Sequence, residues 1–357
     1  MQSRRFQNQI SWLMFVFSIL VIWVHSYNVE LFAGTKLGPA WETAVQIETF
    51  WSVGVGQIAV PGFFLLSSYL FFRTFTWNKL LTKWKSRWFS VAVPYVVWNS
   101  LYYLGYVAAT NLPVISKMIS KKVIPLSFEE LANAILRYSY APIFWYLYQL
   151  IILLILAPVI YLFVKKRIVG VCYLAILIAA LYFRIDTGHP NMDALFYFSV
   201  AAYAAVHGNE WLEKQGSNDR VLAGMLIMIV AIFCYGTMKD PSSNVLWTIF
   251  YRLLAPIAIF FMTSTVELPK TRPWMHQSLF LYAIHFIIVR FMNKGAAIVL
   301  GKLAMETVSV AERMPVFAVG IYFMIPVVTV VCSYLAAVIL SRWIPPVWKI
   351  LSGGRNL

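Results

Sequence analysis

Apolar runs long enough to cross a membrane dominate this chain of 357 residues. A helix needs about 20 predominantly apolar residues to span a bilayer, and backbone polar groups at that depth must be satisfied within the segment. Such runs lie near residues 9–28, 51–72, 88–110, 143–164, 168–184, 192–208, 221–238, 245–266, 276–298 and 315–341. We therefore expect an all-α fold, a polytopic transmembrane bundle of about ten helices.

Composition supports a single membrane-embedded unit. The chain is 61% hydrophobic and 12% charged, far from the usage of soluble domains. No Gly/Ser-rich linker separates the apolar runs, so residues 1–357 are predicted to form one integral-membrane domain. The sequence has no His-x-x-x-His, Cys-x-x-Cys or paired-carboxylate pattern, so no metal site is predicted.

The net charge of +15 is explained by the membrane rather than by nucleic acid. The basic residues collect in short loops between apolar runs, where anionic lipids and the positive-inside bias favour them. With the amino terminus inside, alternate segments hold Arg4, Arg5, Arg73, Lys79, Lys83, Lys85, Arg87, Lys165, Lys166, Arg167, Lys214, Arg220, Lys270, Arg272, Arg342, Lys349 and Arg355. Both termini are therefore predicted to be cytoplasmic, with membrane lipids as partners.

The longest predicted external segment, residues 111–142, carries a helix start signal. Ser127 is followed three residues later by Glu130, which is the spacing of a capping box. A short surface helix is expected to begin there.

The first apolar run contains a histidine, in the stretch "SILVIWVHSYN" from Ser18 to Asn28. Positions seven residues apart lie on one helix face, and so do positions eleven apart, so Ser18 and Met14 share the face of His25. A neutral imidazole can accept a proton as a general base. It can equally well hydrogen-bond another helix, and the first run alone leaves both roles open.

Four further stretches carry a family resemblance. They are "VPGFFLLSSYLFFRTF" from Val60, "KWKSRWFSVAVPYVVWN" from Lys83, "APIFWYLYQLIILLILAPVI" from Ala141 and "SLFLYAIHFII" from Ser278. In this order, together with the first-helix histidine, they resemble the integral-membrane acyltransferase 3 family. The resemblance implies an O-acyltransferase, commonly an O-acetyltransferase. It would move an acyl group from cytosolic acyl-CoA to a hydroxyl of a cell-surface polysaccharide or its lipid-linked precursor.

The resemblance makes His25 the expected general base, because it matches the histidine of the family's Arg-x10-His signature. Met14 stands where that signature has arginine, and a methionine cannot bind a carboxylate or phosphate as a guanidinium does. Either another cation replaces it, or the chemistry is altered or lost. The intramembrane candidates are Arg252 and Arg290, although these side chains could instead snorkel to the membrane surface or pair with Glu48. His285 is expected either to bond another helix or to line the donor path.

The donor is expected to be acyl-CoA, with acetyl-CoA the most common case, and no tightly bound cofactor is expected. Arg73, Lys83, Lys85 and Arg87 would suit its phosphates, although the same cluster can act as a topology determinant. Trp145 matches the family's "LWF" helix start and would pack along the donor, although an isolated tryptophan there can also be an interface anchor.

The family resemblance implies a bacterial cytoplasmic (inner) membrane location. One alternative stays open, a non-catalytic membrane transporter or flippase-like protein for a glycolipid or small solute. Intramembrane histidine and arginine residues fit that role as well, and the loss of the signature arginine favours it.

Overall fold

The computed structural model describes residues 2–33, 38–112, 123–185, 187–214, 218–238 and 245–355. Every regular element in these ranges is a helix, so the predicted all-α bundle is confirmed. Six of the helices are short: α2 (Val29–Ala33), α3 (Pro39–Thr49), α5 (Leu80–Arg87), α8 (Phe128–Arg137), α12 (Asn209–Glu213) and α17 (Pro345–Leu351).

Each of the ten predicted apolar runs coincides with one of the ten longer helices. These are α1 (Gln2–Ser26), α4 (Ala59–Phe72), α6 (Val93–Asn111), α9 (Trp145–Val164), α10 (Arg167–Tyr182), α11 (Met192–His207), α13 (Asn218–Thr237), α14 (Val245–Met262), α15 (Ser278–Glu306) and α16 (Val308–Trp343). Among the described residues, 7 helical segments are long and apolar enough to cross a membrane. Runs 88–110, 168–184 and 192–208 fall outside that set, and α10 and α11 have only 16 residues each.

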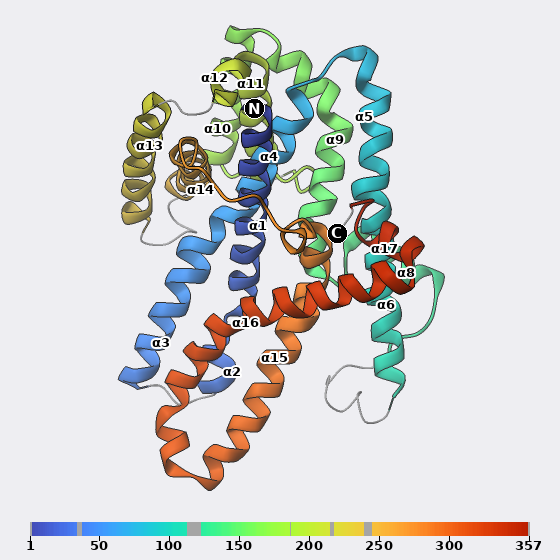
Figure 1. Ribbon diagram of the computed structural model, residues 1–357, viewed down its shortest axis with the longest axis vertical. Coiled ribbons are helices and arrows are strands. Elements are labelled where there is room, and N and C mark those ends of the chain that lie inside the picture. Colours follow the sequence, from blue (N-terminus) through green and yellow to red (C-terminus); the bar gives the residue numbers. More distant parts are fainter. Residues whose placement is uncertain are drawn as a thin grey trace.

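Helix α1 lies inside the bundle and packs against α4, α15 and α16. Phe6 and Phe17 of α1 and Phe64 of α4 are almost completely buried in the main core. Figure 1 shows α15 and α16 forming a hairpin that reaches the end of the molecule opposite the N-terminus. Helix α1 therefore contacts helices from both the early and the late parts of the chain.

Contacts between loops bring several of the predicted cytoplasmic segments together. Asn8 donates from Nδ2 to the carbonyl oxygens of Leu268 and Pro269 at 3.0 Å, and Arg73 pairs with Glu213 at 2.8 Å. Figure 1 shows the N-terminus and α12 near the same end of the molecule. These contacts join segments that the alternation of basic loops predicts to lie on the same side of the membrane.

Two wide helical turns interrupt the long helices, at Phe50–Val55 and Trp88–Ala92. The second has a local cause, because Pro94 has no N–H to donate to the carbonyl of Ser90. The turn widens so that the N–H of Val93 bonds the carbonyl of Trp88. The first joins α3 to α4, so this helical segment runs over Pro39–Phe72 and is longer than the predicted run 51–72.

The predicted surface helix is confirmed as α8. The side chain of Ser127 accepts a hydrogen bond from the N–H of Glu130 at 3.1 Å, which satisfies one of the free N–H groups of the first turn. Residues 113–122 of the predicted external segment lie outside the described residues.

The membrane topology can be tested on either side of α9. Glu129 on α8 and Lys166 after α9 are both exposed, and one membrane crossing lies between them. Glu129→Cys and Lys166→Cys, each made in a chain whose native cysteines are replaced by alanine, should react with an impermeant maleimide from opposite sides of the membrane. Labelling of both from one side would contradict the alternation of basic loops.

Candidate functional site

Two histidines that are distant in sequence meet inside the bundle. The rings of His25, in the last turn of α1, and His285, on α15, have centroids 5.2 Å apart. Phe286 packs its edge on His25 with centroids 5.7 Å apart. The predicted base and one of its predicted partners are therefore in contact.

His285 has a defined hydrogen-bonding pattern. The residue is fully buried, and its Nδ1 lies 2.6 Å from the carbonyl oxygen of Tyr282. A carbonyl only accepts, so this bond assigns the proton to Nδ1 and leaves Nε2 as an acceptor. No partner for Nε2 is found among the described residues. His285 can thus accept a proton or a hydrogen bond from a group placed beside it.

A polar network fixes the chain directly after His25. The buried carboxylate of Glu48 accepts from the backbone N–H of Asn28 at 2.8 Å and of Val29 at 3.3 Å. The side chain of Asn28 donates to Asn293 of α15 at 3.2 Å, and Asn293 in turn donates to the carbonyl of Ser26 at 3.2 Å. Residues from α3 and α15 therefore hold the end of α1, and with it the position of the His25 ring.

The two predicted intramembrane cations lie in different places. The guanidinium of Arg290 stacks on Phe286 at 4.5 Å from the ring centroid, and the same ring packs on His25. Arg252 is on α14, near Tyr251 and Tyr197. The histidine pair thus has Arg290 beside it, whereas no contact joins Arg252 to the pair in the described part of the chain.

A cavity of about 70 Å³ lies at Met14. Its walls come from α1, α4, the end of α5 and the wide turn after it, α9, the start of α15 and the segment after α17: Met14, Phe63, Ser67, Leu70, Arg87, Ser90, Val91, Tyr146, Leu147, Leu150, Ser278, Leu279, Tyr282 and Arg355. Two guanidinium groups, those of Arg87 and Arg355, therefore line the cavity that Met14 also lines. We call it the Arg87 cavity.

Arg87 and Arg355 are both half-buried. Burial lowers the pKa of Arg87, and burial together with the neighbouring charge of Arg87 lowers the pKa of Arg355 to about 10. Both groups remain protonated at neutral pH. Tyr146 and Ser67 face the same cavity, with their hydroxyl oxygens 3.3 Å apart. The cavity therefore offers positive charge and hydroxyl groups to an anion.

The other predicted donor-binding residues serve different contacts. Arg73 is paired with Glu213. The ammonium of Lys83 donates to the carbonyl of Phe71 at 2.8 Å and to Thr74 at 2.9 Å, which closes the end of α4. Lys85 is exposed, and Trp145 packs against Phe64 while its neighbour Tyr146 lines the cavity. Of the predicted cluster, only Arg87 is among the residues that line the cavity.

Helix α15 connects the Arg87 cavity to the histidine pair. Tyr282 lines the cavity, and its ring centroid is 5.8 Å from that of His285, one turn further along. On α1, Met14 and His25 are eleven residues apart, about 16 Å at 1.5 Å per residue. Met14 and Tyr282 of the cavity wall therefore lie on the same two helices as the histidine pair.

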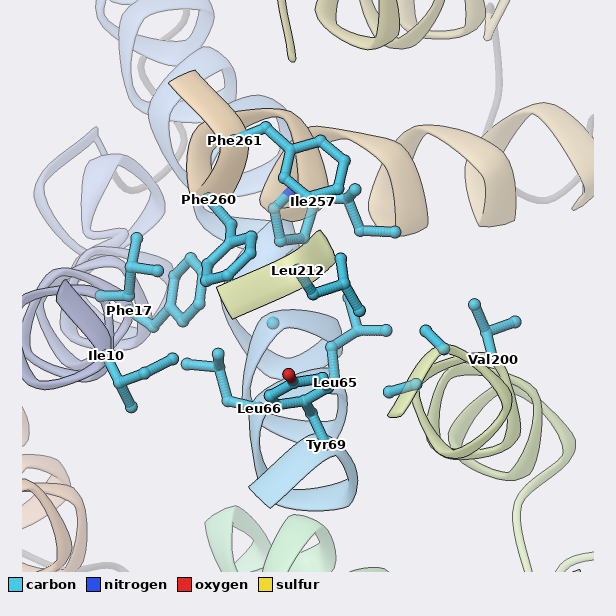
Figure 2. A pocket seen from close by; sticks show the side chains of 15 residues that line it. Ile10, Phe17, Leu65, Leu66, Tyr69, Val200, Leu212, Ile257, Phe260 and Phe261 are labelled. Carbon is cyan, nitrogen blue, oxygen red and sulfur yellow. The ribbon is translucent and has the colours of Figure 1, made fainter. Parts of the chain in front are cut away.

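A second cavity of about 150 Å³ is apolar (Figure 2). Phe17, Leu65, Ile257 and Phe260 are among the side chains around it, and the hydroxyl of Tyr69 is bonded to Asn209 at 2.6 Å. Cavities of this size lined by such residues stay dry and accept hydrocarbon. No acid or imidazole lines it in the described part of the chain, so its lining there offers no carboxylate or imidazole for proton transfer.

Sequence reasoning missed several residues of the Arg87 cavity. Arg355 was predicted only as one of the cytoplasmic basic residues, and Ser67, Ser90, Tyr146 and Tyr282 were given no role. One signal was present, the Gly353-Gly354 pair before Arg355, because two glycines often mark a sharp turn. That signal does not indicate which surface the turn packs on.

Comparison with known protein families gives one match. A family profile described as an acyltransferase domain matches residues 7–344, which includes the histidine pair, Met14 and Arg87. No curated protein and no solved structure matches the chain. Arg355 lies beyond the matched residues.

The network around Glu48 predicts a stability difference between two alanine variants of α3. Glu48→Ala leaves the N–H groups of Asn28 and Val29 without their acceptor, which should cost about 1–3 kcal/mol. Glu42→Ala, at an exposed position of the same helix, should change little. Thermal unfolding in detergent measures both, and equal unfolding midpoints would show that Glu48 does not hold this turn.

Proposed function

The chain belongs to the acyltransferase 3 family, and from that premise we propose that it is a membrane-bound O-acyltransferase. The proposed donor is acyl-CoA, acetyl-CoA in the first instance. The proposed acceptor is a hydroxyl of a cell-surface polysaccharide or its lipid-linked precursor. One observation carries the proposal: helix α15 joins a cationic cavity, suited to the phosphates of the donor, to a buried histidine pair suited to proton transfer.

The proposed reaction needs one general base and returns the proton at the end. His25 removes the proton of the acceptor hydroxyl as the oxygen attacks the thioester carbonyl. The carbon–sulfur bond then breaks, and the proton passes from His25 to the departing coenzyme A thiolate. His285 acts as the orienting residue, because its free Nε2 can accept a hydrogen bond from the ring N–H of His25 and leave the other nitrogen of His25 free as the base.

The orientation follows from the same residues. Arg87 ends one of the basic segments predicted to be cytoplasmic, so we place the cavity on the cytoplasmic side of a bacterial inner membrane, with both termini cytoplasmic. His25 is then in the outer half, where an acceptor arrives. The donor enters from the cytoplasm, and its acyl end reaches His25 along α1.

The alternative of a non-catalytic transporter or flippase-like protein is favoured by the apolar cavity of Figure 2, since a lipid chain could occupy it. The two functions differ in what the purified protein does with its ligand. An acyltransferase should hydrolyse acyl-CoA slowly or acylate itself, and a transporter should do neither. Mass spectrometry of surface glycans from cells with and without the gene should show a shift of one acyl mass if the proposed function is right.

His25→Ala is expected to lower turnover by roughly 10²-fold or more, because positioned proton transfer typically contributes 10²–10⁴-fold. Donor binding should remain, since the Arg87 cavity is about 16 Å away along α1. His276→Ala is the control, at an exposed histidine outside the pair. Single-turnover acyl transfer with labelled donor measures both. Wild-type turnover in His25→Ala would make this histidine a structural residue.

Arg87→Gln is expected to raise the Michaelis constant for acyl-CoA about tenfold or more, because a hydrogen bond to a charged group contributes about 1.5–3 kcal/mol. Lys85→Gln, an exposed cation two residues earlier, should leave it nearly unchanged. Steady-state kinetics over a range of donor concentrations separates this effect from turnover. If both variants gave the same donor dependence, the basic segment would have only a topological role.

A further inference from the structure

We propose that Arg355, in the segment after α17, completes a phosphate-binding site in the Arg87 cavity, and that its ligand is the diphosphate of the donor. This inference deepens the proposed function, and only the identity of the ligand rests on it. The site itself stands on four features: unpartnered buried donors, a rigid turn that carries Arg355, a helix N-terminus and the absence of acidic residues from the described lining.

Two hydrogen-bond donors of the cavity are buried and have no partner among the described residues. They are Nη1 of Arg355 and Oγ of Ser90, and both residues line the cavity. Arg355 is half-buried, and a buried N–H group of a guanidinium that lacks an acceptor costs free energy, so such groups are normally hydrogen-bonded. No carboxylate lines the cavity among the described residues. An anionic ligand would satisfy both groups at once.

The segment that carries Arg355 is fixed in place. Gly353 and Gly354 adopt φ angles of +67° and +77°, which favour glycine. The N–H of Gly354 bonds the carbonyl of Lys349 at 2.7 Å. A Cβ at Gly353 would lie 2.6 Å from the carbonyl oxygen of Ser90, so only glycine permits this close approach to the wide turn after Arg87.

Helix α17 is anchored to the bundle by two tryptophans. The indole N–H of Trp98 donates to the carbonyl of Leu351 at 3.1 Å, and Trp348 packs on Phe280 with ring centroids 5.1 Å apart. Both contacts are buried. Arg355 is therefore presented by a docked element rather than by a free tail.

The start of α15 adds to the attraction for an anion. Ser278 and Leu279, its first two residues, line the cavity. The preceding residue, Gln277, makes no side-chain bond to the free N–H groups of the first turn. Helix N-termini carry partial positive charge, which favours phosphate. Together with two guanidinium groups, this favours an anion with more than one negative charge, and a diphosphate can contact both arginines.

Binding of inorganic pyrophosphate and of coenzyme A to the full-length protein in detergent tests the site by titration calorimetry. Arg355→Gln should weaken both by about tenfold or more, and Arg355→Lys should weaken them less. Lys349→Gln, at an exposed position of α17, should bind as the wild type does. Unchanged binding of pyrophosphate and coenzyme A by Arg355→Gln would overturn the proposal.

Thermal unfolding separates a binding role from a structural one. Because Arg355 has an unpartnered buried group, Arg355→Gln should unfold at the wild-type temperature or above it without ligand, and should lose the stabilisation that coenzyme A gives the wild type. A lower unfolding temperature with full stabilisation by coenzyme A would make Arg355 a structural residue and refute the site.

Phosphatidylglycerol nanodiscs distinguish the two sources of phosphate. Stabilisation that depends on Arg355 with this lipid, but not with coenzyme A, would overturn the assignment to the donor.

Repeating the titrations in His25→Ala separates the two proposals. If pyrophosphate binding depends on Arg355 while the wild type transfers no acyl group, only the proposed function fails. If Arg355→Gln transfers acyl groups with an unchanged Michaelis constant for the donor, only this inference fails.

Discussion

The contact between α1 and α15 is the interaction on which the rest of the structure depends. It brings His25 against His285, and the hydrogen bonds between Asn293 and residues 26 and 28 fix its register. Polar groups in an apolar interior need hydrogen-bond partners. A shift of α1 along α15 would leave several of these groups without a partner. The other helices pack around α1 and α15 and contribute further walls to the cavities beside them.

The Arg87 cavity depends on irregular backbone rather than on regular helix. Pro94 widens the turn that carries Ser90, and two glycines with positive φ bring the segment after α17 against that turn. Wide helical turns are frequent at functional sites, and glycine adopts positive φ without a steric cost. The positive charge at Met14 comes from side chains 73 and 341 positions away in sequence, and not from the helix of Met14 itself.

Much of the helical framework could be predicted from the sequence, because bilayer thickness determines the length of an apolar run. The N-cap at Ser127 was also predictable, since it depends on residues within one turn. The continuous segment Pro39–Phe72 was not predicted to its full length, because Glu42 and Glu48 make its first turns look polar, and the burial of Glu48 against Asn28 appears only in the tertiary structure.

The candidate site was only partly predictable for the same reason. His25 stands out because a polar residue is costly in an apolar run, and its partner His285 lies in another such run. The cluster around Arg87 looked uniform in sequence. However, Arg73 pairs with an acid 140 positions away and Lys83 closes the end of its neighbouring helix, so the cluster divides in space. Nothing local to Arg355 indicates that it lines a cavity.

Helix α15 also sets a fixed length inside the protein. Ser278 lies at the cavity and His285 lies seven residues later, two turns or about 10 Å along one rigid helix. If the proposed donor binds its phosphates near Ser278, its acyl carbon must lie about this far from them to meet the imidazoles. Under the proposed function, a donor with a long arm between phosphate and thioester would span this interval, and the helix would select its substrate by length as well as by charge. The charged end of such a donor would then stay out of the outer half of the membrane.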